Sequence, residues 1–540
     1  MWTSVTRTQD DEDLKALRRI TGNATFQAGD GDLCLEGTRL DIFQQVEDWL
    51  NTIDGSVMLW IRGFPGAGKS AIARTIVNML KKRWSLGSDF FFSRDDAERR
   101  TPLALWCHVL YDLSCQHPGF RDAALAKLQA PDFKIGSAQP GAIVDIIVEA
   151  IQVANEDTNS SGQNLVLVID ALDECLYLPT SLSRQRSAVL SGLQKLCAIK
   201  SAWCRIIVTS RAEKDIEAIL NTENITQIEL LAGGVVNAQS SDDIKRYFDV
   251  YLLHGLPKAK ATSEDIQDLV TKAAGLFIWA KTAMEFVSSS KGFPHKRLQT
   301  LKKIGFGAGS LSTLYDLVLT NQFGETGSVD QEVCWHFQQV VGTMLVAAVP
   351  LTLEQLEGLL LPKASPKSHD RTDRDTILDI LNRLSTVTIW QSLESSDAPV
   401  IQFTHLSFPE FLQDTDNKDK FYGIDTQIAH GTLSLQCLLV MNHELMFNIC
   451  HLPSSHYPNK HYDLHTLVNT YLSLALQYSV QHWSSHLVSV ARNDAVLHQL
   501  NRFLDEKLLF WYESMSLVGA FYNATVALQK CTSWLTVCEL

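Results

Sequence analysis

Residues 63–70 read GFPGAGKS, a complete G-x-x-x-x-G-K-[ST] phosphate-binding pattern. The apolar run at 57–61 predicts a buried parallel strand before it, and residues 70–84 carry apolar side chains at helical spacing after it. The glycines let successive backbone N–H groups approach phosphate oxygens, and the helix N-terminus adds a partial positive charge. We therefore expect Lys69 to reach the β- and γ-phosphates of a nucleotide and Ser70 to offer its hydroxyl to Mg²⁺.

An acidic cluster follows a second apolar run. Residues 165–170 read LVLVID, so Asp170 ends the predicted strand, and Asp173 and Glu174 follow within ALDEC. At the carboxyl end of a parallel strand, Asp170 would hold Mg²⁺ directly or through water. Asp173 or Glu174 would orient or deprotonate a water that attacks the γ-phosphate, and we favour Glu174, although the sequence does not fix which carboxylate points inward. The alternative is a cluster that only caps a helix after a buried strand.

A third apolar run, RIIVTSR at 205–211, ends in Arg211. An arginine at the far end of such a strand would sense or stabilise charge on the γ-phosphate, although it would also be unremarkable as a surface residue. The candidate catalytic residues are therefore Lys69, Asp173, Glu174 and Arg211, and the candidate metal ligands are Ser70 and Asp170.

Strand and helix patterns alternate over the first half of the chain, which is typical of a parallel sheet with crossover helices. Strands are expected at 57–61, 89–92, 165–169, 206–209 and 226–230, helices at 103–114 and 186–197, and a polar linker at 152–163. Beyond residue 231, short amphipathic helices are expected at 242–252, 263–273 and 276–288. Helices, a small hairpin at 387–393 and 400–403, and an apolar helix from 406 favour a winged helix.

These patterns divide the 540 residues into five parts. We expect a polar N-terminal tail at 1–33, a P-loop NTPase domain at 34–235, a helical lid at 236–309, a winged-helix-like domain at 310–415 and an all-helical region at 416–540. Apolar residues make up 45% of the chain and charged residues 20%, so it can bury several cores.

The composition limits the partners and the compartment. The net charge of −14 argues against a general nucleic-acid-binding surface. No apolar run reaches the roughly 18 residues of a membrane span, and the N-terminus is too polar for a signal peptide. Eleven cysteines without a C-x-x-C pair fit a reducing compartment, so we expect a cytoplasmic protein that binds no membrane. The histidines His451, His456, His461 and His465 lack the companions of a zinc site and indicate a polar loop.

The three motifs, in this order and at these separations, resemble the NACHT group of STAND signalling NTPases. The segments CLEGTR (34–39), FFFSRDD (90–96), GLFIWAKTAMEFV (275–287) and IQFTHLSFPEFLQD (401–414) resemble fungal NACHT proteins with a nephrocystin-like N-terminal module. The likeness covers roughly residues 34–414. It implies an α/β P-loop fold with a parallel sheet ordered 5-1-4-3-2, followed by the lid, the winged helix and the helical region.

The resemblance also implies contacts with ATP or ADP. The loop residues Gly63, Phe64, Pro65, Gly66, Ala67, Gly68, Lys69, Ser70 and Ala71 would bind its phosphates, and Gly37, Thr38 and Arg39 match the segment beside the base and ribose. His405 matches a winged-helix histidine that touches the β-phosphate in a closed ADP state; it could otherwise be a structural histidine. One departure matters, because Gly275-Leu276-Phe277 stands where many relatives have G-x-P, which puts adenine contacts from the lid in doubt.

The leading functional hypothesis is an NLR-like nucleotide switch in signal transduction, with slow Mg²⁺-dependent ATP hydrolysis that resets it. Self-association on activation is expected from the resemblance, while the activating ligand and the protein partner are left open. The alternatives are a continuously cycling P-loop ATPase or phosphotransferase, and a scaffold that does not use nucleotide. Only the scaffold would dispense with Lys69, Ser70, Asp170 and Glu174.

Overall fold

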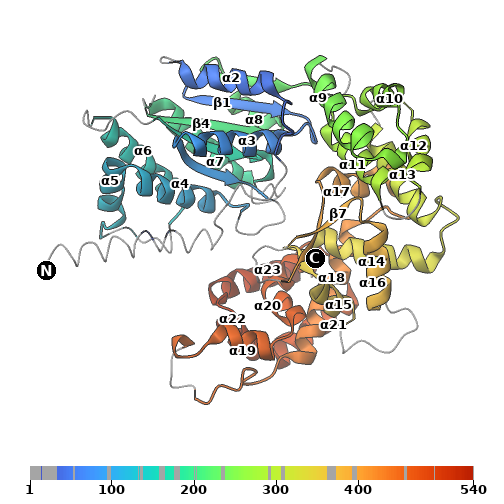
Figure 1. Cartoon of the computed structure of the whole chain (residues 1–540). Coiled ribbons are helices and arrows are strands. Elements are labelled where there is room, and N and C mark those ends of the chain that lie inside the picture. Colours follow the sequence, from blue (N-terminus) through green and yellow to red (C-terminus); the bar gives the residue numbers. More distant parts are fainter. Residues whose placement is uncertain are drawn as a thin grey trace. The chain divides into compact units, whose positions relative to one another are not determined.

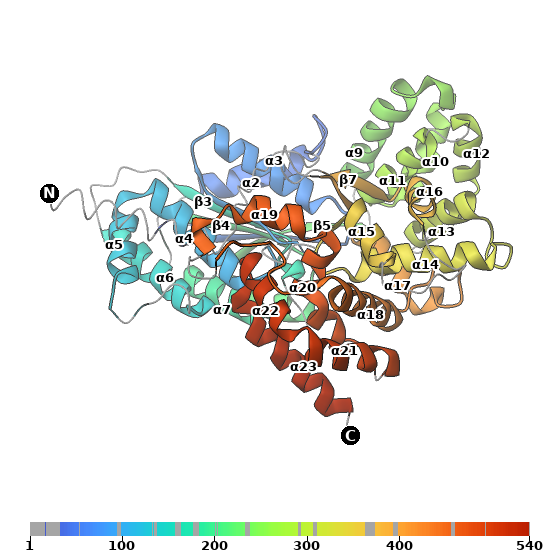
Figure 2. The same cartoon turned by 90° about the horizontal axis from the view of Figure 1, so that it is seen from below.

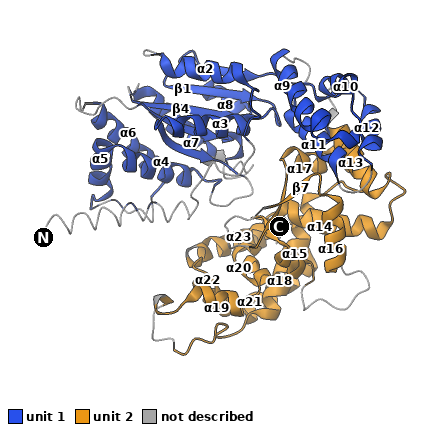
Figure 3. Ribbon diagram, in the orientation of Figure 1, with its two compact units in different colours: residues 1–311 blue, residues 312–540 orange. Residues whose placement is uncertain are grey.

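The computed structural model divides into two compact units, residues 1–311 and 312–540 (Figures 1 and 3). Each unit is described by itself. The structure describes residues 14, 17, 33–52, 55–93, 99–131, 133, 138–156, 164–175, 183–199, 201, 203–232, 238–289, 293–305, 310–361, 373–391, 398–454, 459–491 and 493–538. Most of the N-terminal tail expected at 1–33 lies outside these ranges.

A five-stranded parallel sheet forms the centre of the first unit. Its strands are β1 (Met58–Gly63), β2 (Leu86–Phe91), β3 (Leu165–Asp170), β4 (Cys204–Ser210) and β5 (Ile225–Leu230), in the order β2-β3-β4-β1-β5. This is the predicted order read from the other edge, so the predicted α/β fold class with a five-stranded parallel sheet is confirmed. Because the strands run the same way, their carboxyl ends share one edge, at which the loop 63–70 begins.

Alternate residues of each strand enter two separate cores. Met58 and Trp60 of β1 are buried with residues of α4 to α8, whereas Leu59 and Ile61 are buried with residues of α2 and α3. The helices are α2 (Leu40–Asn51), α3 (Lys69–Lys82), α4 (Pro102–Gln116), α5 (Pro118–Leu128), α6 (Pro140–Glu156), α7 (Ser183–Ile199) and α8 (Lys214–Leu220). Figure 2 shows α2 and α3 on one side of the strands and α4, α6 and α7 on the other, so the unit has three layers.

Two local predictions were wrong. Residues 152–156, expected in a polar linker, are the last turns of α6, because buried Ala154 continues its apolar face. The helix expected at 242–252 is α9 (Ala238–Phe248), and the chain continues as a π-helix, η3 (Asp249–His254). The π-turn carries the chain to the short helix η4 (Pro257–Ala259).

Three further helices, α10 (Ser263–Ala273), α11 (Phe277–Ser288) and α12 (Pro294–Lys302), complete the first unit. The α10 helix starts with a capping box between Thr262 and Asp265. The fully buried ammonium of Lys272 lies 2.8 Å from Asp268 and donates to the carbonyl of Lys302 at 2.6 Å. Since a cation stabilises a helix C-terminus, Lys272 joins α10 to the end of α12.

The second unit is mainly helical around a small antiparallel sheet, β6-β8-β7. The strands are β6 (Leu351–Thr352), β7 (Thr388–Gln391) and β8 (Val400–Phe403). Its helices are α13 (Ser310–Phe323), α14 (Gln331–Val346), α15 (Leu353–Leu360), α16 (Arg374–Arg383), α17 (Ser407–Gln413), α18 (Thr426–Glu444), α19 (Leu464–Tyr471), α20 (Leu474–Leu487), α21 (Asp494–Glu506), α22 (Leu508–Leu517) and α23 (Ala524–Cys538). Among the described helices of the chain, none combines the length and apolarity that crossing a bilayer requires.

Two histidines meet between α18 and α20. The Nδ1 atoms of His430 and His486 lie 3.1 Å apart, and Nε2 of His486 lies 2.8 Å from the hydroxyl oxygen of Tyr478, which accepts from the N–H of Ala348 at 2.9 Å. Burial lowers the pKa of both histidines, and the charges of His430, His482 and Lys530 lower the pKa of His486 further. Both imidazoles are therefore kept neutral at pH 7.

Acidification is expected to destabilise this helical region. Below pH about 6.5 these histidines bind protons in the unfolded chain but stay neutral in the folded chain. The free energy of unfolding therefore decreases as the pH is lowered, by up to about 1.4 kcal/mol per pH unit for each histidine. Urea melts between pH 6.5 and 5 would measure this slope, and His486→Gln should flatten it. The matched control is His498→Gln at an exposed position, which should keep the wild-type slope. Equal slopes for His486→Gln and the wild type would contradict the assignment.

Candidate functional site

Two glycines shape the phosphate-binding loop, residues 63–70, between β1 and α3. Gly66 and Gly68 have φ angles of +77° and +95°, which residues with a Cβ rarely adopt. The N–H of Ala67 donates to the carbonyl of Phe64 at 3.2 Å, and α3 begins at Lys69. The loop therefore turns sharply from strand into helix, with the N-terminus of α3 directly behind it, which is an anion-binding arrangement.

Lys69 lies among four other charged side chains. Its ammonium donates to the carbonyls of Gly63 at 2.9 Å and Phe64 at 3.0 Å. Burial lowers the pKa of Lys69, while the nearby carboxylates of Asp173, Asp170 and Glu174 oppose the shift and the guanidinium of Arg211 adds to it. The structure thus brings together the five charged residues that the sequence nominated from three separate motifs.

The end of β3 joins the loop through Asp170, which is buried. Its carboxylate accepts hydrogen bonds from the hydroxyls of Thr209 and Ser70. Burial raises the pKa of Asp170, and these two hydrogen bonds, with the charges of Arg74 and Lys69, oppose the rise. A serine hydroxyl beside a carboxylate is an all-oxygen donor set, so the residues fit Mg²⁺.

Thr209 was missed as a site residue in the sequence. Its hydroxyl also accepts from the N–H of Ala171 at 3.1 Å, so it holds both Asp170 and the residue after it. The signal was available in principle, because β3 and β4 pair in parallel with Ile169 opposite Val208. That register places Thr209 beside Asp170, but the pairing of β3 with β4 comes from the sheet order and not from the local sequence.

Asp173 and Glu174 differ in what they contact. Asp173 is buried, and its carboxylate accepts from the backbone N–H of Arg211 at 3.0 Å and lies 3.0 Å from Nε of the same arginine. Glu174 is half-buried. Asp173 therefore holds the turn after β4 in place with both of its oxygens.

Buried Arg186 of α7 contacts both the turn after β3 and the residues after β4. Its guanidinium lies 2.7 Å from the carboxylate of Glu213 and 3.0 Å from that of Asp215, and Nη1 is 3.5 Å from the carbonyl of Asp173. The position of Arg186 was predicted to begin a helix, with no role at the site. Nothing in the local sequence shows this contact, because the three partners come from the turn after β3 and from the residues after β4.

Arg39 is held by protein groups on every side. Its guanidinium donates to the carbonyl of Ala67 at 2.7 Å and to the hydroxyl of Ser240 at 3.0 Å, and it lies 3.7 Å from the carboxylate of Asp243. It also lies over the ring of Phe277 at 4.8 Å. Burial lowers the pKa of Arg39 and raises that of Asp243, and their mutual attraction opposes both shifts.

Helix α11 contacts the phosphate-binding loop directly. The N–H of Ile278 donates to the carbonyl of Gly66 at 3.1 Å. Phe277 packs against Arg39 and lies 6.3 Å from the ring of Tyr247 in α9. The start of α11 therefore lies beside both Arg39 and the loop.

His405 lies in the second unit, just after β8. Its Nδ1 lies 2.7 Å from the hydroxyl of Ser407 and accepts from the N–H of Ser407 at 3.1 Å. The hydroxyl of Ser407 also lies 2.8 Å from that of Tyr315. These contacts fix the orientation of the imidazole within its own unit.

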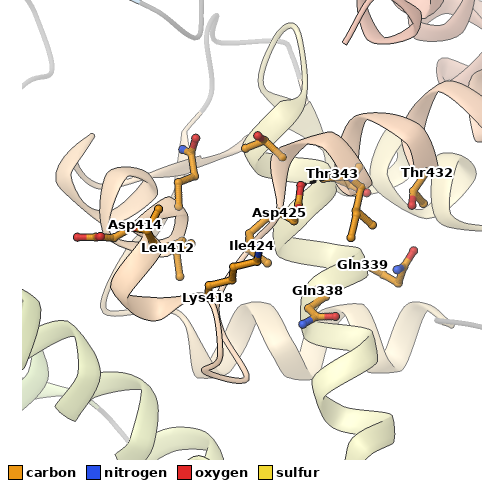
Figure 4. Close-up of a pocket in the computed structure, with 15 residues that line it drawn as sticks. Gln338, Gln339, Thr343, Leu412, Asp414, Lys418, Ile424, Asp425 and Thr432 are labelled. Carbon is orange, nitrogen blue, oxygen red and sulfur yellow. Dashed lines mark hydrogen bonds between the residues drawn. The ribbon is translucent and has the colours of Figure 1, made fainter. Parts of the chain in front are cut away.

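A cavity of about 450 Å³ lies elsewhere in the second unit, between α14, the end of α17 and the start of α18 (Figure 4). Two carboxylates on its wall accept backbone N–H groups at helix N-termini: Asp414 caps the short helix η5 (Thr415–Asn417), and Asp425 caps α18. Lys418 is the cation on this wall. The cavity has no glycine-rich turn at a helix N-terminus, so it does not resemble a nucleotide phosphate site. Within the described ranges, no group of three or more His, Cys, Asp or Glu could hold a metal ion; His456 lies outside them.

Comparison with known proteins places a recognised domain on this site. Residues 37–211 match the family described as nephrocystin 3, N-terminal, and this stretch holds the phosphate-binding loop, Asp170 and Arg211. The chain therefore contains a nephrocystin-like P-loop module, and the resemblance is confirmed over these residues. It is also 25% identical over 524 residues to the vegetative incompatibility protein HET-E-1 of Podospora anserina. That match covers 91% of this chain, which spans about a third (35%) of the relative's length.

Two solved structures are similar to this chain at low identity and low TM-score. One is the STAND protein PH0952 of Pyrococcus horikoshii, which carries a tetratricopeptide repeat sensor; it is 12% identical, with a TM-score of 0.41, over 96% of this chain and 66% of that one. The other is the ORC2 protein of Aeropyrum pernix in its ADPNP–ADP complexes, 9% identical with a TM-score of 0.31 over 78% of this chain and 97% of that one.

Proposed function

We propose that this chain is a STAND-type P-loop NTPase of the NACHT group that binds ATP and ADP and works as a slow, Mg²⁺-dependent conformational switch. The observation that carries the proposal is the hydrogen bond between Ser70 of the loop and Asp170 at the end of β3, with Lys69 beside them. The loop offers backbone N–H groups and the ammonium of Lys69, which suit a nucleotide phosphate. Ser70 and Asp170 offer oxygen ligands, which suit the metal that accompanies the phosphate.

Each charged residue receives one role in this proposal. Lys69 binds the β- and γ-phosphates, and Ser70 and Asp170 hold Mg²⁺, which supplies charge neutralisation when bound. Glu174 orients or deprotonates the attacking water, and Arg211 stabilises charge on the γ-phosphate. Asp173 is a positioning residue, because its carboxylate contacts Arg211 through both oxygens.

The contacts of the lid support a switch more than a freely cycling enzyme. Residues 236–309 serve as the helical lid, which contacts the loop directly through Ile278. It also contacts the loop indirectly, because Asp243 and Ser240 bind Arg39, which donates to the carbonyl of Ala67. A nucleotide that binds the loop can thereby change the equilibrium of the lid, provided that it binds two arrangements with different affinity. We assign 310–415 to a winged-helix domain and 416–540 to a helical region, and we infer self-association on activation, with the protein partner and activating ligand unassigned.

The nucleotide that co-purifies with the chain tests this function. We expect mass spectrometry of the denatured protein to recover ADP, and we expect turnover well below the roughly 1–100 s⁻¹ of kinases. Turnover within that range would favour a cycling ATPase or phosphotransferase. A folded protein that retains neither ADP nor ATP in equilibrium dialysis would leave only a scaffold.

His405→Ala is expected to favour self-association. If His405 donates to the β-phosphate of ADP, its loss removes one charge-assisted hydrogen bond from the closed state. Size-exclusion chromatography with saturating ADP should then show a larger oligomeric fraction than the wild type. His443→Ala, at an exposed position on α18, serves as the control. A profile identical to the wild type would make His405 a structural residue only.

A further inference from the structure

The buried guanidinium of Arg39 joins its own segment to three other segments of the first unit. It contacts Ala67 in the phosphate-binding loop, Ser240 and Asp243 in α9, and Phe277 at the start of α11 (α9 and α11 are labelled in Figure 1). The backbone N–H of Arg39 also donates to Asp243 at 3.2 Å. Only 4% of Arg39 is exposed to solvent, so these contacts belong to a buried side chain and are not incidental contacts at the surface.

The bond to Ala67 acts on one peptide of the loop. In a trans peptide the C=O and the following N–H point in opposite directions. Because the carbonyl of Ala67 faces Arg39, the N–H of Gly68 points away from it. Backbone N–H groups at this position of such a loop are those that face a phosphate.

The preceding peptide is held by the lid as well. The carbonyl of Gly66 accepts from the N–H of Ile278 at the start of α11. Two successive carbonyls of the loop are therefore fixed from outside, one by Arg39 and one by the lid helix. Since Gly66 and Gly68 have positive φ angles and no side chains of their own to hold them, the loop conformation depends on these outside contacts.

A second arginine holds the segment of Arg39 against α9 from the opposite direction. Arg246 of α9 donates to the carbonyl of Glu36 at 2.8 Å. Its guanidinium lies so close to Gly37, at φ +81°, that a Cβ there would be 2.6 Å from Cζ of Arg246. Residues 36–39 and α9 are thus joined by two arginines, one from each segment, and a displacement of α9 would move residues 36–39 with it.

We propose that Arg39 is a positioning residue that couples the helical lid to the phosphate-binding loop. By holding the carbonyl of Ala67 and the carboxylate of Asp243 together, it orients the Gly68 N–H for a nucleotide phosphate only while α9 is in place. This inference rests on the proposed function, and it gives Arg39 a role between the lid and the loop in place of a contact with the base. A buried ion pair such as Arg39–Asp243 adds little to the free energy of folding by itself. Fixing the relative position of two segments is the better-attested role of such a pair.

The test is a double-mutant cycle on ADP affinity, measured by titration calorimetry on the full chain. Arg39→Ala and Asp243→Ala are each expected to weaken ADP binding by about 10- to 100-fold, because each removes hydrogen bonds to a charged group. The double variant is expected to be no weaker than the weaker single variant, because both lose the same connection. Arg83→Ala is the matched control, since it removes an exposed pair with Glu47 between α3 and α2 and should leave the affinity unchanged.

Hydrogen exchange separates coupling from a merely structural role. In the wild type, ADP should slow the exchange of the α9 amides, and Arg39→Ala should remove this ADP-dependent protection while the unfolding midpoint stays similar. If the alanine variants do not fold, Arg39→Lys and Asp243→Asn take their place; lysine keeps the charge but cannot reach both partners at once. Those two variants are expected to show the same non-additive loss of affinity.

Several results would overturn the proposal. Wild-type affinity in folded Arg39→Ala would remove the role of Arg39, and strictly additive losses in the double variant would remove the coupling through Asp243. Failure of the proposed function looks different, because the wild type would then bind no ADP and Lys69→Ala would be indistinguishable from it.

Discussion

Lys69→Ala is expected to weaken ATP and ADP binding by about 2–5 kcal/mol, which is roughly 30-fold or more. Alanine removes the ammonium that is proposed to contact the β- and γ-phosphates, and Arg211 would keep only its own contact with the γ-phosphate. We expect the protein without nucleotide to fold, because alanine removes a buried charge whose desolvation lowers the pKa of Lys69.

The measurement is nucleotide affinity together with the midpoint of thermal unfolding without nucleotide. Lys82→Ala is the matched control, because Lys82 is exposed at the other end of the same helix. We expect that control to bind ADP as the wild type does. Unchanged affinity in Lys69→Ala would remove the phosphate role of the loop.

Glu174→Gln is expected to lower the rate of ATP hydrolysis by about 10²–10⁴-fold while the affinity for ATP changes little. An amide keeps the size of the carboxylate but cannot accept the proton of the attacking water. Because hydrolysis in the wild type is expected to be slow, single-turnover assays with excess protein are the appropriate measurement.

Asp173→Asn should behave differently, which distinguishes the two carboxylates. An asparagine cannot accept from both the N–H and Nε of Arg211, so the turn after β4 loosens. Affinity for ATP and hydrolysis should then fall together. Glu217→Gln, in a partly exposed pair with Arg62, is the control for the loss of a carboxylate. If Asp173→Asn lost hydrolysis alone while Glu174→Gln stayed active, the two assignments would be exchanged.

The sequence predicted the loop and the strands well because their signals are local. The eight residues 63–70 and the apolar runs beside them carry the pattern for a turn between strand and helix. The sheet order came from the family resemblance, because no single strand encodes which neighbour it pairs with. The ends of α6 and α9 were misjudged, since a buried Ala154 and a π-turn after Phe248 depend on packing and not on local composition.

The finer division of labour among the charged residues needed the structure. Nothing in the order Asp173, Glu174 shows that Asp173 contacts Arg211, because that contact crosses from the turn after β3 to the turn after β4. The same applies to Arg39 and Asp243, which are 204 residues apart in the sequence. Thr209 and Arg186 escaped notice for the same reason, since their partners are neighbours only in the folded sheet.

The single direction of the five strands separates two kinds of sensitivity. Near their amino ends, Arg205 of β4 donates to the carbonyls of Trp49, in the last turn of α2, and of Thr52, just after that helix. These contacts lie at the other end of β4 from Ser210 and Arg211. Substitutions there should alter how firmly the scaffold is built without altering its response to nucleotide. The amino ends of the strands thus contribute to stability, whereas the carboxyl ends carry the proposed nucleotide site.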